Sequence, residues 1–212
     1  MPKVNKREAK KAIKCEEEET MAMSAVIPVV MSVPTSIVHF SEEFAPGRFV
    51  VYSRYNEQDW IHVREYVTYG ERTYPSKKGV ALTPVRLRTL MNKMEEIDEQ
   101  LKQANATAAY KVEQSTYKTH LGAAIYAAVD KKYHGVDLRR YWVPERQTTV
   151  FPTRNGIYLP SSQWASLKEK LNELVVARPE LTVVEECFHQ NQMGFIDCRE
   201  CSPFGWRFES FN

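Results

Sequence analysis

The chain has 212 residues, of which 43% are hydrophobic and 26% are charged, and its formal net charge is +2. This much apolar material can build a buried core, which excludes a chain that is disordered throughout. A net charge near zero does not by itself indicate nucleic-acid binding, so an argument for such binding has to rest on where the charges are placed.

Residues 1–40 are predicted to form a charged and largely irregular segment. Positions 1–14 hold six basic residues and one acidic residue, and four consecutive glutamates follow at 16–19. This composition favours a solvated tail. The clustered lysines at 10–14 have two alternative interpretations, a nuclear address or a loose phosphate-binding arm.

The compartment is predicted from the apolar run and the cysteines. The most apolar run, 21–33, is interrupted by Pro28 and is too short to span a bilayer as a helix. Three of the four cysteines lie in the last 26 residues, which is not the spread of a secreted disulfide framework. We therefore expect an intracellular protein without a membrane segment, and the lysine cluster suggests a nuclear one.

An internal repeat organises the rest of the chain. The segment IHVREYV at 61–67 aligns with VDLRRYW at 136–142, and YPSKKGVAL at 74–82 aligns with FPTRNGIYL at 151–159. The offset between aligned residues grows from 75 to 77, so one hairpin loop differs by two residues. Two blocks in the same order indicate two copies of one structural unit.

Each copy is predicted to begin with strands. Alternating apolar and polar residues predict strands over 50–55 and 61–66, joined by turn-forming residues at 56–59. The next turn is expected at 69–72 in the first copy and at 143–146 in the second. A last short strand is expected to open at a glycine in each copy, Gly79 or Gly156.

Each copy is predicted to end in a helix with one apolar face. Apolar residues recur at spacings of three, four and three, which is the pattern of a single helix face. They are Leu87, Leu90, Met94 and Ile97 in the first copy, and Trp164, Leu167, Leu171 and Leu174 in the second. Thr83 and Pro84 suit the start of the first helix, and Ser161 or Ser162 suits the N-cap of the second.

These eight residues are the predicted helix-pairing interface. A four-stranded sheet with one helix cannot cover its own apolar face, so each helix needs a partner. We predict that the two helices pair within one chain, and pairing between chains is the alternative.

The predicted class is α+β, with two β-β-β-β-α units that form a pseudo-dimer. The expected boundaries are 41–104 for the first unit, 105–119 for a linker, 120–179 for the second unit and 180–212 for a C-terminal segment.

Both copies resemble a known family. The first copy keeps Arg64, Glu65, Tyr66, Pro75, Lys77, Lys78, Gly79, Leu82 and Pro84. The second keeps Arg139, Tyr141, Trp142, Pro152, Arg154, Gly156, Leu159, Gln163, Trp164, Leu167 and Lys168. In this order they resemble the single-stranded-DNA-binding domain of the transcriptional coactivator called positive cofactor four, or p15, which implies a tandem pair of such domains.

The resemblance implies curved antiparallel sheets, paired helices and a sheet surface that exposes basic and aromatic side chains to unpaired DNA. A tandem chain looks like the dimer of that family made covalent. The Whirly family of plant proteins is similar in carrying two such units and assembles into tetramers, so a homo-oligomer is the alternative to a single pseudo-dimer.

Single-stranded DNA offers phosphates and exposed base faces, so a binder needs spaced cations and aromatic rings. The strands of this chain carry both types of side chain. Because neighbours along a strand point to opposite faces, about half of the rings should be core. The predicted DNA-binding residues are Arg54, Tyr66, Lys77, Lys78, Arg139, Tyr141, Trp142 and Arg154.

The two halves are expected to contribute unequally. Val67 stands where the family has tryptophan, Arg140 replaces its glutamate and Asn155 replaces its lysine. We therefore predict more stacking from the second half, through Trp142, and more charge from the lysines of the first.

The C-terminal segment contains a candidate zinc site. Cys187, His189, Cys198 and Cys201 form two ligand pairs separated by a short loop, as in small tetrahedral sites. Free structural cysteines are the alternative, since a cysteine and a histidine two positions apart are closer than the usual first pair. No other cofactor is expected.

The sequence favours a binding protein over an enzyme. It has no glycine-rich phosphate loop, nucleophile elbow or repeated carboxylate pair. We expect single-stranded DNA as the ligand, in transcription with coactivator-type protein partners or as a replication or repair accessory. The alternative is a protein-interaction or structural module with the same fold and no DNA contact.

Overall fold

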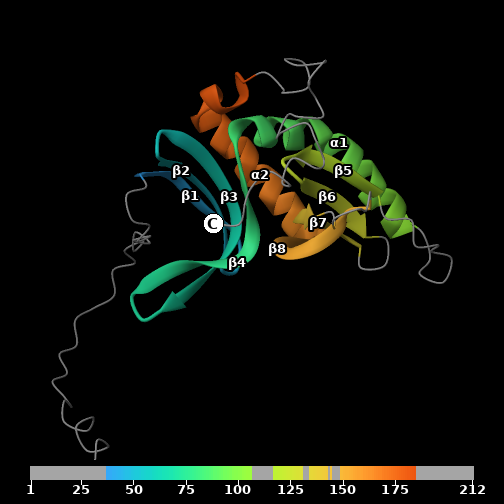
Figure 1. Cartoon of the computed structure of the whole chain (residues 1–212), viewed down its shortest axis with the longest axis horizontal. Helices are drawn as coiled ribbons and strands as arrows, with labels where there is room; N and C mark the ends of the chain where they lie inside the picture. Colours follow the sequence, from blue (N-terminus) through green and yellow to red (C-terminus); the bar gives the residue numbers. More distant parts are fainter. Residues whose placement is uncertain (1–36, 107–116, 131–133, 143, 145–148, 185–212) are drawn as a thin grey trace, which may run out of the picture.

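Each half of the chain folds into a four-stranded antiparallel sheet followed by one helix (Figure 1). The computed structural model describes residues 37–106, 117–130, 134–142, 144 and 149–184. The first half contains β1 (Ile37–Ala45), β2 (Arg48–Tyr55), β3 (Gln58–Tyr69), β4 (Arg72–Leu82) and α1 (Pro84–Ala106). The second contains β5 (Tyr117–Gly122), β6 (Ile125–Asp130), β7 (Gly135–Trp142), β8 (Phe151–Pro160), α2 (Ser161–Ala177) and the 3-10 helix η2 (Pro179–Thr182). This confirms the predicted α+β class and its pseudo-dimeric arrangement.

Tight turns join the strands of the first sheet. Asn56 and Glu57 adopt φ values of 48° and 61° between β2 and β3, as a two-residue hairpin turn requires. Gly70, with φ of 62°, turns β3 into β4. Both turns lie where the sequence predicted them. The turn expected at 143–146 falls largely outside the described residues.

The last strand of each sheet is longer than predicted and contains a bulge. Gly79 does not open β4: it lies within the strand, opposite Arg64. Two residues further along β3, Tyr66 pairs with Pro75, so β4 uses four residues where β3 uses two. In the second sheet Arg139 pairs with Gly156 and Tyr141 with Pro152, which gives the same bulge. The two glycines therefore mark a kink within a continuous strand, and not the start of a strand as predicted.

The glycine is required by close packing rather than by a strand start. A Cβ atom on Gly79 would lie 2.6 Å from the Cα of Arg64, and the backbone φ there is 155°. A Cβ on Gly156 would lie 2.6 Å from the Cγ of Arg139. Only glycine lets the neighbouring strand pass at this distance.

The two helices start differently. Thr83 precedes α1, and its Oγ1 accepts a long bond of 3.5 Å from the Arg86 amide, which agrees with the predicted start. The predicted serine cap of α2 is wrong. The residue before α2 is Pro160, which makes no side-chain cap, and the Ser161 hydroxyl instead donates to the carbonyl oxygen of His134 at 2.8 Å.

Each helix packs against the sheet of the other half. Helix α1 contacts β5 and β6, whereas α2 contacts β1 (Figure 1). All eight residues of the predicted helix-pairing interface are buried, and they join one apolar core with residues of both sheets. The halves are thus joined by exchanged helices, and β4 contacts β8 where the two sheets meet.

Within the described residues, no helix is both long and apolar enough to cross a membrane.

Candidate nucleic-acid interface

A basic groove lies between the two halves of the molecule. It has a volume of about 630 Å³ and takes its walls from both sheets and the start of α1. Its lining residues are Trp60, Arg64, Lys77, Gly79, Val80, Ala81 and Arg86 from the first half, and Ala123, Ile125, Arg140 and Asn155 from the second. Among the lining residues that the structure describes, four side chains are cationic and none is acidic, so the groove suits a negatively charged ligand.

Arg64 is held in the groove by the bulge of β4. Its Nη1 donates to the carbonyl oxygen of Ser76 at 2.7 Å, while its Nε is buried and has no hydrogen-bond partner in the described structure. Burial lowers the pKa of this guanidinium below its ordinary value. A buried donor without a partner is costly, so an acceptor entering the groove would relieve that cost.

The bulge itself is stabilised in the same way in both halves. The Ser76 hydroxyl accepts the Lys78 amide at 3.1 Å, and the Thr153 hydroxyl accepts the Asn155 amide at 3.2 Å. These short side-chain to backbone bonds favour a turn-like kink over a straight ladder. The kink places the residue between them, Lys77 in the first half, on the surface.

The predicted DNA-binding cations fall into three groups. Lys77 lines the groove, and Arg154 is exposed at the equivalent bulge position of β8. Lys78 and Arg139 have internal partners: Lys78 Nζ lies 3.0 Å from Glu65, and Arg139 forms two bonds to Asp137, at 2.7 and 3.0 Å.

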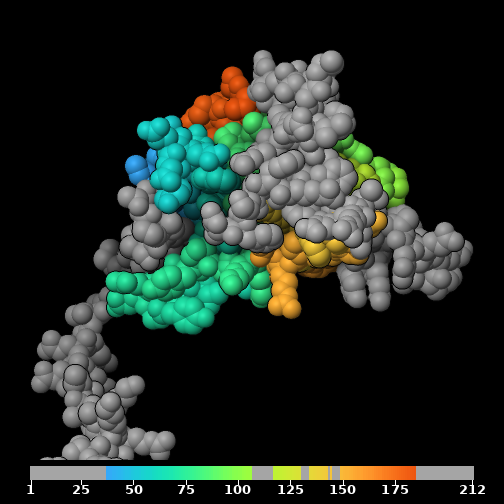
Figure 2. Space-filling model, in the orientation of Figure 1, coloured from blue at the N-terminus to red at the C-terminus, as the bar shows by residue number. Residues whose placement is uncertain are grey.

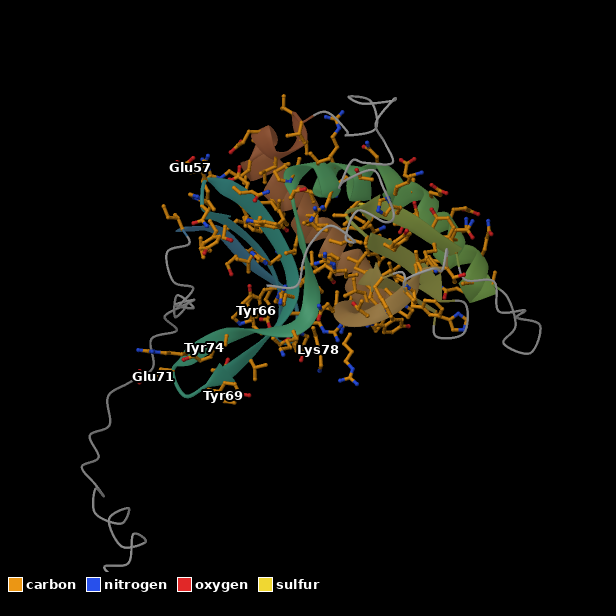
Figure 3. The ribbon with its side chains drawn as sticks, in the orientation of Figure 1. Glu57, Tyr66, Tyr69, Glu71, Tyr74 and Lys78 are labelled. Atoms are coloured by element: carbon orange, nitrogen blue, oxygen red, sulfur yellow. The ribbon has the colours of Figure 1, made fainter. Side chains whose placement is uncertain are left out.

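Arg54 lies apart from the other predicted contacts. It is exposed near the β2–β3 turn, 3.8 Å from a carboxylate oxygen of Asp59. The turn residue Glu57 marks that end of the sheet in Figure 3, well away from Lys78. The structure therefore does not bring Arg54 together with the groove.

Exposed aromatic pairs mark the far ends of the long hairpins. Tyr69 and Tyr74 lie 6.3 Å apart near the tip of the β3–β4 hairpin, on either side of Glu71 (Figure 3). Trp142 and Phe151 lie 6.4 Å apart at the corresponding end of β7 and β8. Their exposed fractions are 70% and 37% for the tyrosines, 44% for Trp142 and 40% for Phe151. In Figure 2 the β3–β4 hairpin projects from the body of the molecule beside β8.

Two predicted stacking residues are buried. Tyr66 is 8% exposed and meets Phe49 edge-on at 5.4 Å. Tyr141 is 6% exposed, 4.9 Å from Tyr126, with Lys118 Nζ 4.6 Å from its ring centre. Burial raises the pKa of both phenols. Their positions favour a role in supporting the sheet surface rather than in stacking on bases.

The helix-pairing interface contains one polar contact that the periodicity did not reveal. Trp164 Nε1 donates to Asp98 Oδ1 at 2.6 Å, and the Lys168 ammonium pairs with the other oxygen of Asp98. These residues come from α2 and α1, so the contact joins the two halves. The sequence also did not predict that Trp60 and Arg86 belong to the groove. Neither residue lies in the repeated blocks, and only the fold places them beside Lys77.

The candidate zinc ligands Cys187, His189, Cys198 and Cys201 lie outside the described residues, so that site stays a prediction. Among the residues that are described, no group of three or more histidine, cysteine, aspartate or glutamate side chains could hold a metal ion.

Comparison with curated proteins gave no match. A family model does match part of the chain, over residues 46–93, which run from the β1–β2 turn into α1. This match supports nucleic-acid binding and transcriptional coactivation at the level of the family. The interpretation of residues 120–179 as a second copy, and the Whirly-like architecture, stay predictions. The family whose model matches residues 46–93 is described as Transcriptional Coactivator p15 (PC4).

Proposed function

We propose that this protein is a non-enzymatic binder of single-stranded DNA, which acts as a transcription coactivator or as a replication or repair accessory in the nucleus. The observation that carries the proposal is the groove between the halves, where the described lining residues include four cationic side chains and one tryptophan, and no carboxylate is among them. The family match over residues 46–93 supports the same ligand class.

The cations of the groove would bind the backbone of the strand. Lys77, Arg86 and Arg140 come from three separate elements, so their charges are spread along the groove rather than concentrated at one point. A nucleic-acid backbone carries regularly spaced phosphates, and each one neutralised releases a counterion. The groove therefore fits an extended polyanion better than a small one.

The aromatic side chains would bind the bases. Trp60 lines the groove, and the side chains of the pairs Tyr69–Tyr74 and Trp142–Phe151 are exposed to solvent. Stacking of a base on an aromatic ring contributes roughly 1–3 kcal/mol and needs an unpaired base. This requirement is why we propose a single strand as the ligand.

A duplex is a poorer fit. Recognition in the major groove commonly uses a helix that is free to enter it. Both described α-helices bury their apolar faces in the core that joins the halves, and each packs across the other half's sheet. Neither helix is therefore free to enter a duplex.

Fluorescence anisotropy with a labelled strand of about 20 nucleotides, single or annealed, tests the proposal across a salt series. We expect preference for the single strand, and an affinity that falls linearly with salt on logarithmic axes, with a slope of about −0.7 for each phosphate bound. No binding at low salt would refute DNA binding and would favour a protein-interaction module with the same fold.

A further inference from the structure

We infer that Asn155 recognises a base of the bound strand, and that the groove prefers adenine over thymine at that position. The inference rests on the proposed function, because it concerns the strand that the groove would bind. It adds one base-specific contact to a groove whose cations would hold the phosphate backbone.

Asn155 differs from the other polar side chains of the groove in carrying a hydrogen-bond acceptor. The arginines, the lysine and the indole of Trp60 are donors only. Among the described lining residues, the Oδ1 atom of Asn155 is therefore the only side-chain acceptor. Within a DNA strand the phosphates and sugars offer acceptors but no donor, so this oxygen can find a donor only on a base.

The position of Asn155 suits a base better than a phosphate. Its backbone amide donates to Thr153 Oγ1 at 3.2 Å, which fixes it at the bulge of β8, and its side chain is exposed. Its counterpart in the repeat is Lys78, whose ammonium pairs with Glu65 at 3.0 Å. An amide in place of the lysine gives up attraction for phosphate and gains a neighbouring donor and acceptor. This pair of groups matches the edge of a base.

Trp60 supplies the ring on which the base would stack. It lies on β3 in the first half, is half-buried and lines the same groove as Asn155, which comes from β8. Half-burial keeps the indole in place and leaves part of it accessible. Because stacking depends little on the type of base, Trp60 would position a base and Asn155 would discriminate between bases.

Adenine is the base that a carboxamide matches best. Its N6 amino group donates and its N7 atom accepts, and asparagine binds both with a pair of hydrogen bonds. The corresponding edge of thymine carries the O4 acceptor and a methyl group, so it offers Asn155 no donor. The edge of guanine carries two acceptors, which match arginine or lysine instead. The larger purine ring would also cover more of Trp60 than a pyrimidine does.

Anisotropy titrations of the full chain with DNA oligoadenylate and oligothymidylate of about 12 nucleotides test the inference. The quantity compared is the ratio of the two affinities, since the self-stacking of the adenine strand is the same for every variant. In Asn155→Ala this ratio should fall about fivefold or more, while the salt slope stays unchanged because no charge is lost. Asn172→Ala, which removes an exposed carboxamide from α2, should leave both quantities unchanged. Urea unfolding checks that both variants fold like the natural chain.

A second variant separates the amide from its position. Asn155→Lys restores the residue type of the first half, so it should lose the same preference for adenine and steepen the salt slope by about 0.7. An unchanged ratio in both variants would overturn the inference while leaving single-strand binding intact. A change in the ratio between RNA and DNA strands of one sequence, in place of the base ratio, would also overturn it, because the acceptor would then bind the 2′-hydroxyl. Absence of any binding by the natural chain would instead refute the proposed function.

Discussion

The contact of Asp98 with Trp164 and Lys168 should contribute measurably to the pairing of the two halves. In Asp98→Ala the indole donor of Trp164, which is 1% exposed, loses its 2.6 Å partner. A buried donor left without a partner costs about 1–3 kcal/mol. The paired Lys168 and Asp98 side chains are 27% and 40% exposed, so their ion pair adds less than about 1 kcal/mol. We therefore expect a loss of roughly 2–3 kcal/mol in the free energy of unfolding.

Urea unfolding of the full chain, followed by circular dichroism, measures this loss. With a slope of about 2 kcal/mol per molar urea, the midpoint should fall by about 1 M. Trp164→Phe keeps a ring but removes the donor, so a double-mutant cycle isolates the bond. The two changes should be non-additive by about 1 kcal/mol or more. Strictly additive losses, or an Asp98→Ala midpoint equal to that of the natural chain, would refute the reasoning.

Three further predictions concern the sheets and the core. Gly79→Ala should lower the free energy of unfolding by more than about 1 kcal/mol, since its Cβ would press on the Arg64 backbone. Gly70→Ala would place a Cβ with nothing within 4 Å, so only the strain of its φ of 62° opposes it and its loss should be the smaller one when urea midpoints are compared. Leu174→Ala should cost about 2–5 kcal/mol, because this side chain is fully buried in the core between the halves, and a loss below about 1 kcal/mol in urea would contradict that placement. Burial, with a smaller effect of Arg64, lowers the pKa of His62 to about 4 from 6.5. As the pH falls, His62 of the unfolded chain takes up a proton before His62 of the folded chain, so the stability present above about pH 6.5 should decline toward pH 4. Urea titrations at pH 7 and pH 5 should show a smaller decline for His62→Gln than for the natural chain. An equal decline in both would contradict this role of His62.

The helices and the order of the strands could be predicted from the sequence because their signals are local. Leu87 to Ile97 and Trp164 to Leu174 repeat one helical spacing, and the burial of all eight residues follows from it. The first strand of each sheet gave a weaker signal. Strand β1 is an edge strand with mostly exposed residues, so it lacks the alternation that marks a half-buried strand.

The groove could not be predicted, because its walls come from distant parts of the chain. Only the packing of each helix on the other half's sheet, together with the contact of β4 with β8, places Trp60, Arg86 and Arg140 beside Lys77. The composition of the strands indicated candidate aromatic rings and cations, but it did not indicate which of them lie together in the fold. The strand alternation said that about half of the rings would be buried, but it could not identify Tyr66 as one of them, because a bulge shifts the register beside it.

Hydrogen–deuterium exchange of the full chain, with and without an oligothymidylate of about 20 nucleotides, tests the central claim most directly. The account predicts that the strand slows exchange in peptides that cover 60–81 and 137–142, which include groove-lining residues, the pair Tyr69–Tyr74 and Trp142. Exchange on the solvent face of α2 should stay unchanged. Protection confined to α2, or to parts of the chain outside both sheets, would contradict the claim that the groove and the hairpin ends bind the strand.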